Sequence, residues 1–147
     1  PGVGGHCIAV DPWFIISGAP EESQIIHAAR TKNTFKPSII IEKVTALADE
    51  HPQKKIICMG LSYKPDIDDL RESPSKEIFD ALRRKYGNRV EGVEPNIPQS
   101  IPLRINVTNI EDVMSSDHII VLLVAHKEFF NLRPLSQHVV KTIGIWR

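Results

Sequence analysis

The sequence predicts an α/β fold in which a glycine-rich loop and a long helix precede a small, doubly wound parallel sheet of the Rossmann-like type. Short apolar runs at residues 55–60 and 119–124, with an amphipathic segment between them, are typical of strands buried on both faces. Glycine and proline punctuation over residues 1–20 indicates the loop. We therefore expect two parts, residues 1–53 and residues 54–147.

Residues 21–51 have the pattern of a helix interrupted by Pro37. The apolar residues that recur at helical spacing are Ile25, Ile26, Ala29, Ile40, Val44 and Leu47. We expect one long helix kinked at the proline, or two helices in sequence. Such a helix serves either as a dimer contact or as a connector packed on its own domain.

The rest of the chain alternates strand and helix signals. After the strand at 55–60, Ser73 is placed to cap a helix that has Pro74 in its first turn and that ends at Gly87. The remaining expected elements are strands at 90–93, 105–107, 119–124 and 139–145, with a short helix at 110–114.

Composition excludes several classes of function. Lysine plus arginine equals aspartate plus glutamate at 18 each, so the chain lacks the basic footprint of a nucleic-acid or anionic-membrane binder. No apolar stretch is long enough to predict a membrane span. Two cysteines are too few for a disulfide framework and fit a cytoplasmic protein. The start at Pro1, without a methionine, suggests the interior of a longer chain.

The loop at residues 2–7, Gly-Val-Gly-Gly-His-Cys, is not a dinucleotide fingerprint. Cys7 stands where the third glycine is required, and neither a strand nor a helix frames the motif. Cys7 is a candidate nucleophile with Asp11 four residues on, although a structural cysteine is the commoner case. A zinc site built from His6, Cys7, His27 and Cys58 has no recognised spacing, and Cys58 is expected in the core.

Two motifs resemble the UDP-glucose/GDP-mannose dehydrogenase family. Residues 2–14 are similar to its active-site loop, which has a glycine pair before a cysteine and an aspartate four residues later. Residues 60–74, Gly-Leu-Ser-Tyr-Lys-Pro-Asp-Ile-Asp-Asp-Leu-Arg-Glu-Ser-Pro, resemble the opening of its UDP-binding domain. The two motifs stand in the family's order and are separated by the expected long helix, which makes the resemblance specific.

The resemblance implies an NAD-dependent oxidation of a UDP-sugar C6 alcohol to a carboxylate. Cys7 matches the cysteine that forms a thiohemiacetal and then a thioester, and Asp11 matches the aspartate that positions the hydrolytic water. The residues that match substrate-binding positions are Gly2, Val3, Gly4, Gly5, His6, Tyr63 and Lys64. NAD is implied to bind mainly to an amino-terminal domain that precedes these motifs in the family, so this chain alone is expected to be inactive.

The resemblance also implies a homodimer formed through the helix at 21–51. Within the family, residues 6–14 look most like the UDP-N-acetylmannosamine branch, with the UDP-N-acetylglucosamine branch as the alternative. Isoleucine at position 143 replaces a basic residue that the family places there to hold the UDP-sugar, which costs about 1.5–3 kcal/mol if nothing substitutes. A non-catalytic nucleotide-sugar-binding module is therefore a rival interpretation.

Other charged residues of residues 60–74 have ordinary explanations. Asp66, Asp68 and Asp69 are expected in turn and capping roles. Arg71 and Glu72 are expected to form an ion pair that holds the loop.

Overall fold

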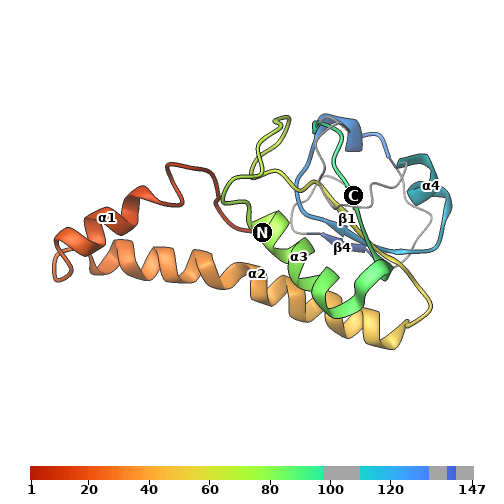
Figure 1. The fold of residues 1–147 in the computed structure, drawn as a ribbon, viewed down its shortest axis with the longest axis horizontal. Helices are drawn as coiled ribbons and strands as arrows, with labels where there is room; N and C mark the ends of the chain where they lie inside the picture. The colour runs from red at the N-terminus through yellow and green to blue at the C-terminus, as the bar shows by residue number, and fades with distance from the viewer. Residues whose placement is uncertain (98–109, 133–138, 142–147) are drawn as a thin grey trace.

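The computed structural model describes residues 1–97, 110–132 and 139–141, which form a parallel sheet and a helical arm that projects from it (Figure 1). The four strands are β1 (Ile56–Met59), β2 (Val90–Val93), β3 (Ile119–Leu122) and β4 (Val139–Lys141). Their order in the sheet is β2-β1-β3-β4, and all neighbouring pairs are parallel. The α/β fold is thus confirmed.

The two central strands are β1 and β3, in register from Ile56 beside Ile119 to Met59 beside Leu122. The chain leaves β1 toward β2 on one side of the sheet and later returns to β3 on the other side. The carboxyl ends of β1 and β3 therefore form a topological switch point, where sheets of this type bind ligands.

Helices cover both faces of the sheet. Helices α2 (Gln24–Glu50) and α3 (Pro74–Tyr86) bury one face, where Val44 and Leu82 pack with Ile56 and Val121. Helix α4 (Ile110–Ser115) and the 3-10 turn η2 (Lys127–Phe129) cover the other face. This two-sided burial explains why the two central strands, β1 and β3, are apolar at every position instead of alternating.

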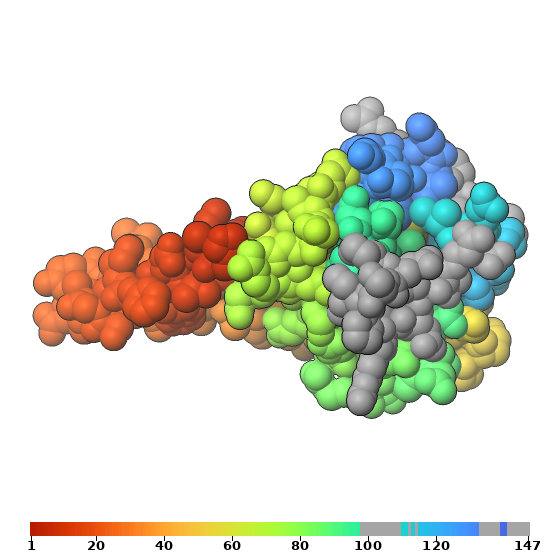
Figure 2. All heavy atoms as spheres, turned by 45° about the horizontal axis from the view of Figure 1, so that its top comes forward, coloured from red at the N-terminus to blue at the C-terminus, as the bar shows by residue number. Residues whose placement is uncertain are grey.

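Helix α2 is one continuous helix that passes through Pro37, as one of the two expected arrangements has it. Because proline has no N–H, the carbonyl of Asn33 receives no helical hydrogen bond at this point. The buried residues of α2 are Pro37, Ile40, Val44 and Ala48, all in its second half. Its first half forms the arm seen in Figure 2, where Ile25 is 86% exposed.

Helix α1 (Asp11–Gly18) was not predicted, and the expectation of a loop over residues 1–20 is wrong for its second half. Asp11 lies in the first turn of this helix with Pro12 beside it, which is a standard start signal. The glycines and prolines of residues 1–20 had favoured a loop, and the apolar run at residues 13–16 has no amphipathic period that would indicate a helix.

Helix α3 begins and ends where expected. The Ser73 hydroxyl oxygen accepts a hydrogen bond from the Lys76 N–H at 3.3 Å, and Pro74 occupies the first turn. Gly87 follows with φ 59°, in the left-handed region that favours glycine. It also starts the short 3-10 helix η1 (Gly87–Arg89), which leads into β2.

The remaining expectations divide between confirmed and undescribed segments. The short helix at 110–114 and the strands at 55–60, 90–93 and 119–124 are present. The strand expected at 105–107 lies outside the described residues, as does everything after Lys141, including Ile143. Within the described part of the chain, no helix is both long and apolar enough to cross a bilayer.

Candidate functional site

Two loops far apart in sequence, residues 1–10 and residues 60–73, lie against each other at the junction of arm and sheet (Figure 1). Gly4 and Gly5 are buried in this contact. A Cβ at Gly4 would overlap the Glu72 carbonyl oxygen, and one at Gly5 would lie 2.8 Å from Cε2 of Tyr63. The two glycines therefore permit the close approach of the loops, which is a structural requirement separate from any contact with a ligand.

Asn33 of α2 anchors the first loop. Its side-chain oxygen accepts the Val3 N–H at 2.7 Å, and its amide nitrogen donates to the Val3 carbonyl oxygen at 2.9 Å. The Gly5 N–H donates to the Glu72 carbonyl at 3.3 Å. The loop is thus tied both to the long helix and to the second loop. Sequence reasoning missed Asn33, because nothing local pairs it with a residue 30 positions away.

Cys7 and Asp11 lie one helical turn apart where the first loop enters α1. The Asp11 N–H donates to the Cys7 carbonyl oxygen at 2.8 Å, and both side chains are exposed. Residues at this spacing share one face of a helix. A thiol and a carboxylate are therefore presented together beside the loop contact.

Tyr63 and Lys64 lie on the second loop. The Tyr63 ring is half-buried against Gly5, and its N–H donates to the Asp69 carbonyl oxygen at 3.3 Å, which closes the loop. The exposed Lys64 ammonium lies 5.7 Å from the centre of the Tyr63 ring. An aromatic face beside a cation is the kind of surface that holds a nucleotide diphosphate.

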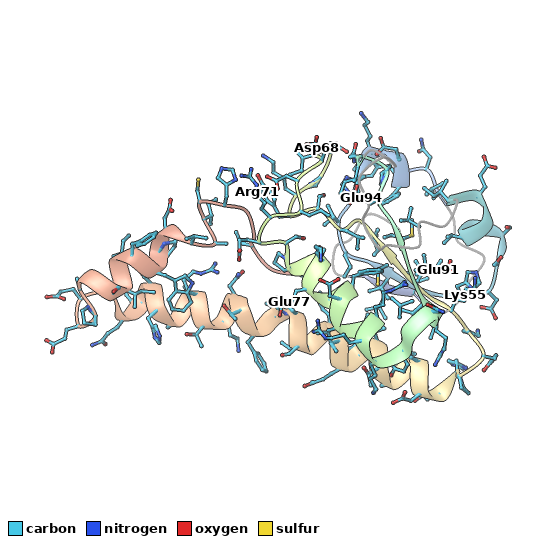
Figure 3. The ribbon with its side chains drawn as sticks, in the orientation of Figure 1. Lys55, Asp68, Arg71, Glu77, Glu91 and Glu94 are labelled. Carbon is cyan, nitrogen blue, oxygen red and sulfur yellow. The ribbon has the colours of Figure 1, made fainter. Side chains whose placement is uncertain are left out.

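Arg71 pairs with Asp69 and not with Glu72, which corrects the expected ion pair. The guanidinium donates to both carboxylate oxygens, at 3.0 Å to Oδ1 and 2.7 Å to Oδ2, because the turn brings the two side chains together. Hydrogen bonds from Arg71 lower the pKa of Asp69 to about 2. His6 Nδ1 lies 4.0 Å from the same carboxylate. Asp69 thus links Arg71 on its own loop (Figure 3) to the first loop.

Cys58 lies in β1 with no exposed surface, in the core position expected from the sequence. Burial raises the pKa of its thiol to about 12, because the thiolate would be desolvated there. Cys7, by contrast, is exposed. The two cysteines therefore do not belong to one site.

A buried polar cluster at the switch point was not predicted. Glu94 directly follows β2 and accepts hydrogen bonds from the Leu61 N–H at 2.6 Å and the Ser62 N–H at 3.0 Å. Its second oxygen accepts the Asn96 N–H at 3.2 Å. His126, four residues after β3, places Nε2 3.1 Å from Glu94. The sequence did contain a signal for this cluster: Glu94 follows the strand expected at 90–93, and His126 follows the strand expected at 119–124. Residues in such positions meet at the carboxyl edge of a parallel sheet.

The pKa of Glu94 is below its usual range. Burial is the largest single influence and raises it, but hydrogen bonds from His126, Leu61 and Asn96 together outweigh burial. The buried carboxylate is therefore kept charged by donors of the protein itself.

Asp66, His126 and Glu128 have ligand atoms within 4.8 Å of one another, a spacing that a metal ion can use. Nδ1 of His126, however, already accepts the Asp66 N–H at 3.0 Å. Nε2 faces Glu94 inside the protein. With both ring nitrogens engaged, the histidine cannot serve as a ligand without breaking these contacts, so we do not assign a metal here.

The sequence model of a protein family, described as the UDP binding domain of the UDP-glucose/GDP-mannose dehydrogenase family, matches residues 57–143. The chain belongs to this family. It is 43% identical over 152 residues to the NDP-N-acetyl-D-galactosaminuronic acid dehydrogenase of Ralstonia solanacearum, covering 99% of this chain and 36% of that protein. It is 38% identical over 161 residues to the UDP-N-acetyl-D-mannosamine dehydrogenase of Escherichia coli K12, covering 100% and 38%.

Solved structures agree with this placement. The UDP-N-acetyl-mannosamine dehydrogenase of S. aureus superposes with a TM-score of 0.75 at 31% identity, covering 95% of this chain and 32% of that one. A UDP-D-ManNAc dehydrogenase from Pyrococcus horikoshii gives 0.80 at 24% identity, which supports the fold alone. The chain thus spans about a third of the length of these relatives, from 32% to 38%. The resemblance to this family is confirmed.

Proposed function

We propose that this chain is the carboxy-terminal, UDP-sugar-binding part of an NAD-dependent UDP-N-acetyl-D-mannosamine 6-dehydrogenase of the cytoplasm. The observation that carries the proposal is the contact between the two loops. One loop carries an exposed cysteine, and the other carries Tyr63 and Lys64. The family model and the named relatives support the same assignment.

In this proposal each loop has a chemical task. Lys64 binds the diphosphate of the UDP-sugar by charge-assisted hydrogen bonds, while the backbone of Gly2, Val3, Gly4, Gly5 and His6 lines the sugar. The Cys7 thiol adds to the aldehyde carbon of the oxidation intermediate and gives a thiohemiacetal, which becomes a thioester when its carbon gives up a hydride to NAD⁺ and its hydroxyl loses a proton. Asp11, one turn away, orients the water that hydrolyses the resulting thioester.

The described residues do not fit a dinucleotide cofactor. The loop after β1 has one glycine, Gly60, where the fingerprint needs three, and the switch-point crevice is filled by Glu94 and His126. NAD, which accepts the hydrides in this class of reaction, is therefore proposed to bind residues outside this chain. The isolated 147-residue chain is expected to bind the UDP-sugar without oxidising it.

We also propose a homodimer formed through the arm and the helix at 21–51. The first half of α2 and the adjoining α1 expose several large apolar side chains, and such exposed apolar surface marks a contact with another protein. The large apolar residues exposed there are Trp13, Phe14, Ile15, Ile25 and Phe35. A second copy of the chain would cover them.

A second sugar is favoured by a specific observation. The Ralstonia relative, at 43% identity, is named for N-acetyl-D-galactosaminuronic acid. The active-site loop at residues 2–14 is also compatible with UDP-N-acetylglucosamine as the substrate.

A different alternative is a module that binds a nucleotide-sugar without catalysis. The feature that favours it is the isoleucine at position 143.

A calorimetric titration of the chain with UDP, UDP-N-acetylmannosamine, UDP-N-acetylgalactosamine and NAD⁺ in parallel tests the proposal. Binding of UDP and one UDP-sugar, without binding of NAD⁺, is the expected result. Lys64→Gln should weaken UDP binding about tenfold or more, the equivalent of one charge-assisted hydrogen bond. Lys43→Gln, at an exposed lysine of α2, is the matched control. Equal affinity of both variants for UDP would contradict the role of Lys64.

A further inference from the structure

The switch-point crevice of this sheet is closed from within. In open parallel sheets the space beyond the carboxyl ends of the strands at a switch point normally receives the ligand. Here His126, whose ring has no exposed surface, follows β3 at the carboxyl edge of the sheet, and Glu94, 6% exposed and labelled in Figure 3, follows β2 at the same edge. The space in which such sheets usually hold a ligand is therefore taken up by side chains of the protein itself.

The hydrogen bonds show which nitrogen of the His126 ring carries the proton. Nδ1 of His126 accepts the Asp66 N–H at 3.0 Å, and the Asn96 amide nitrogen lies 2.9 Å from the same atom. The ring proton must therefore be on Nε2, which donates to Glu94. Each of the two side chains thus holds a different part of the loop.

Glu94 holds the beginning of the loop and His126 holds its middle. The Leu61 and Ser62 N–H groups both donate to one oxygen of Glu94. Further along, Asp66 has φ 60°, a conformation that a non-glycine residue keeps only when its surroundings hold it. Its N–H donates to His126, and its carboxylate accepts the Lys127 N–H at 2.9 Å.

Tyr63 and Lys64 lie between these two anchors. The Ser62 hydroxyl donates to the Lys64 carbonyl oxygen at 2.8 Å, which ties the intervening turn to the cluster. We propose that Glu94 and His126 are positioning residues, which fix residues 61–66 so that Tyr63 and Lys64 present a preorganised surface to a nucleoside diphosphate. The inference rests on the proposed function, because it assigns the ligand to Tyr63 and Lys64. The two positioning residues do not touch the ligand themselves.

Two substitutions at His126 separate its two contacts. In His126→Asn the side-chain oxygen can stand in for Nδ1 and accept the Asp66 N–H, while the contact with Glu94 is lost. In His126→Gln the side-chain nitrogen can stand in for Nε2 and donate to Glu94, while the acceptor for Asp66 is lost. Glu94→Gln retains one oxygen for the Leu61 and Ser62 N–H groups, whereas Glu94→Ala retains none.

Hydrogen exchange of the 147-residue chain measures the anchoring without any ligand. His126→Gln should accelerate exchange of the Asp66 amide about tenfold, the equivalent of one lost hydrogen bond, and His126→Asn should restore most of its protection. Glu94→Ala should expose the Leu61 and Ser62 amides, and Glu94→Gln should protect them. Unchanged protection of Asp66 in His126→Gln would overturn the anchoring role of the histidine.

Calorimetric titration with UDP then tests positioning. His126→Gln should lower UDP affinity about tenfold, and His126→Asn should recover it. Val113→Ala, a buried substitution in α4 on the other face of the sheet, controls for general destabilisation. Equal loss of affinity in Val113→Ala would overturn the proposal. Absence of UDP binding by the wild-type chain, with the exchange pattern as expected, would contradict the proposed function and the ligand role but not the anchoring.

Discussion

The two halves of helix α2 have the same secondary structure but opposite surroundings. Residues 37–48 contribute four buried side chains to the core above the sheet, whereas residues 24–36 contribute none. Ile40 is 9% exposed and Ile25 is 86% exposed on the same helix. One half is stabilised by its own chain, and the other carries apolar side chains that this chain does not cover. Exposed apolar residues on a rigid support indicate a contact surface.

The two cysteines also have opposite surroundings, and their rates of alkylation should show the largest difference of all. Cys7, exposed on the loop at the base of the arm, should react with iodoacetamide at pH 8 as an accessible thiol does. Cys58, with a pKa raised to about 12, should react only through opening of the sheet, which makes it slower by about a thousandfold or more. Peptide mass spectrometry separates the two rates. Comparable rates in the native chain would show that β1 is not in a stable core.

The same substitution in each half of α2 should differ by a large free energy. Ile40→Ala removes methyl groups from the core and should lower the free energy of unfolding by about 2–5 kcal/mol. Ile25→Ala should change it by about 0.5 kcal/mol or less in a monomer. Urea denaturation at several protein concentrations measures both. A cost for Ile25→Ala that grows with protein concentration would identify Ile25 as part of a subunit interface.

Substitutions at two glycines compare the crowded contact between the two loops with the open end of the arm. Gly4→Ala places a methyl group onto the Glu72 carbonyl and Pro74, and overpacking of this kind costs about 1–3 kcal/mol. Gly18→Ala, at the open end of α1, meets no atom within 4 Å. It should be neutral or stabilising by about 0.5–1 kcal/mol, because alanine is the better helix former. Thermal unfolding of both variants measures the difference, and equal midpoints would mean that the two loops do not touch in solution.

The smallest expected effect on folding concerns Asp69, whose carboxylate is paired on the surface. Its folded pKa of about 2 is below the ordinary 3.8, so its contribution to stability is present above pH 3.8 and is lost as the pH falls through 2. Arg71→Gln should move the Asp69 titration back toward 3.8. Carbon-13 detection of the carboxyl groups measures it.

The internal control for that titration is Asp49 of α2. Its pKa is lowered mainly by a hydrogen bond from the Tyr86 hydroxyl, so Arg71→Gln should leave it unchanged. An Asp69 midpoint unaffected by the substitution would contradict the pairing seen in the structure.

The sheet and α3 were predictable because their signals are local. Apolar runs such as residues 119–124 identify strands buried on both faces, and Ser73 with Pro74 identifies a helix start. Helix α1 was missed because glycines and prolines around it favoured a loop. It also buries no residue, so its apolar residues do not follow the spacing of a helix that packs on a core.

The candidate site was predictable only in its motifs. Tyr63 and Lys64 were found by resemblance, and Cys7 by its chemistry and by resemblance, but the partners that hold the two loops were not found. Asn33 binds Val3 across 30 positions and His126 binds Asp66 across 60, and no local pattern encodes such pairs. The error at Arg71 has a similar origin. The adjacent Glu72 was taken as its partner, whereas a turn brings the Arg71 side chain to Asp69, two residues earlier.

The shared core of α2 and the sheet limits how this region can recombine during evolution. Ile40, Val44 and Ala48 belong to the same cluster as Ile56 and Val121. A crossover between relatives at residue 53 would unite a helix from one parent with a sheet shaped by another, and complementary packing would be lost. A crossover near Pro37 would keep the cluster whole and exchange only the arm. Descendants with a new contact partner are therefore expected to arise by exchange on the amino-terminal side of Pro37.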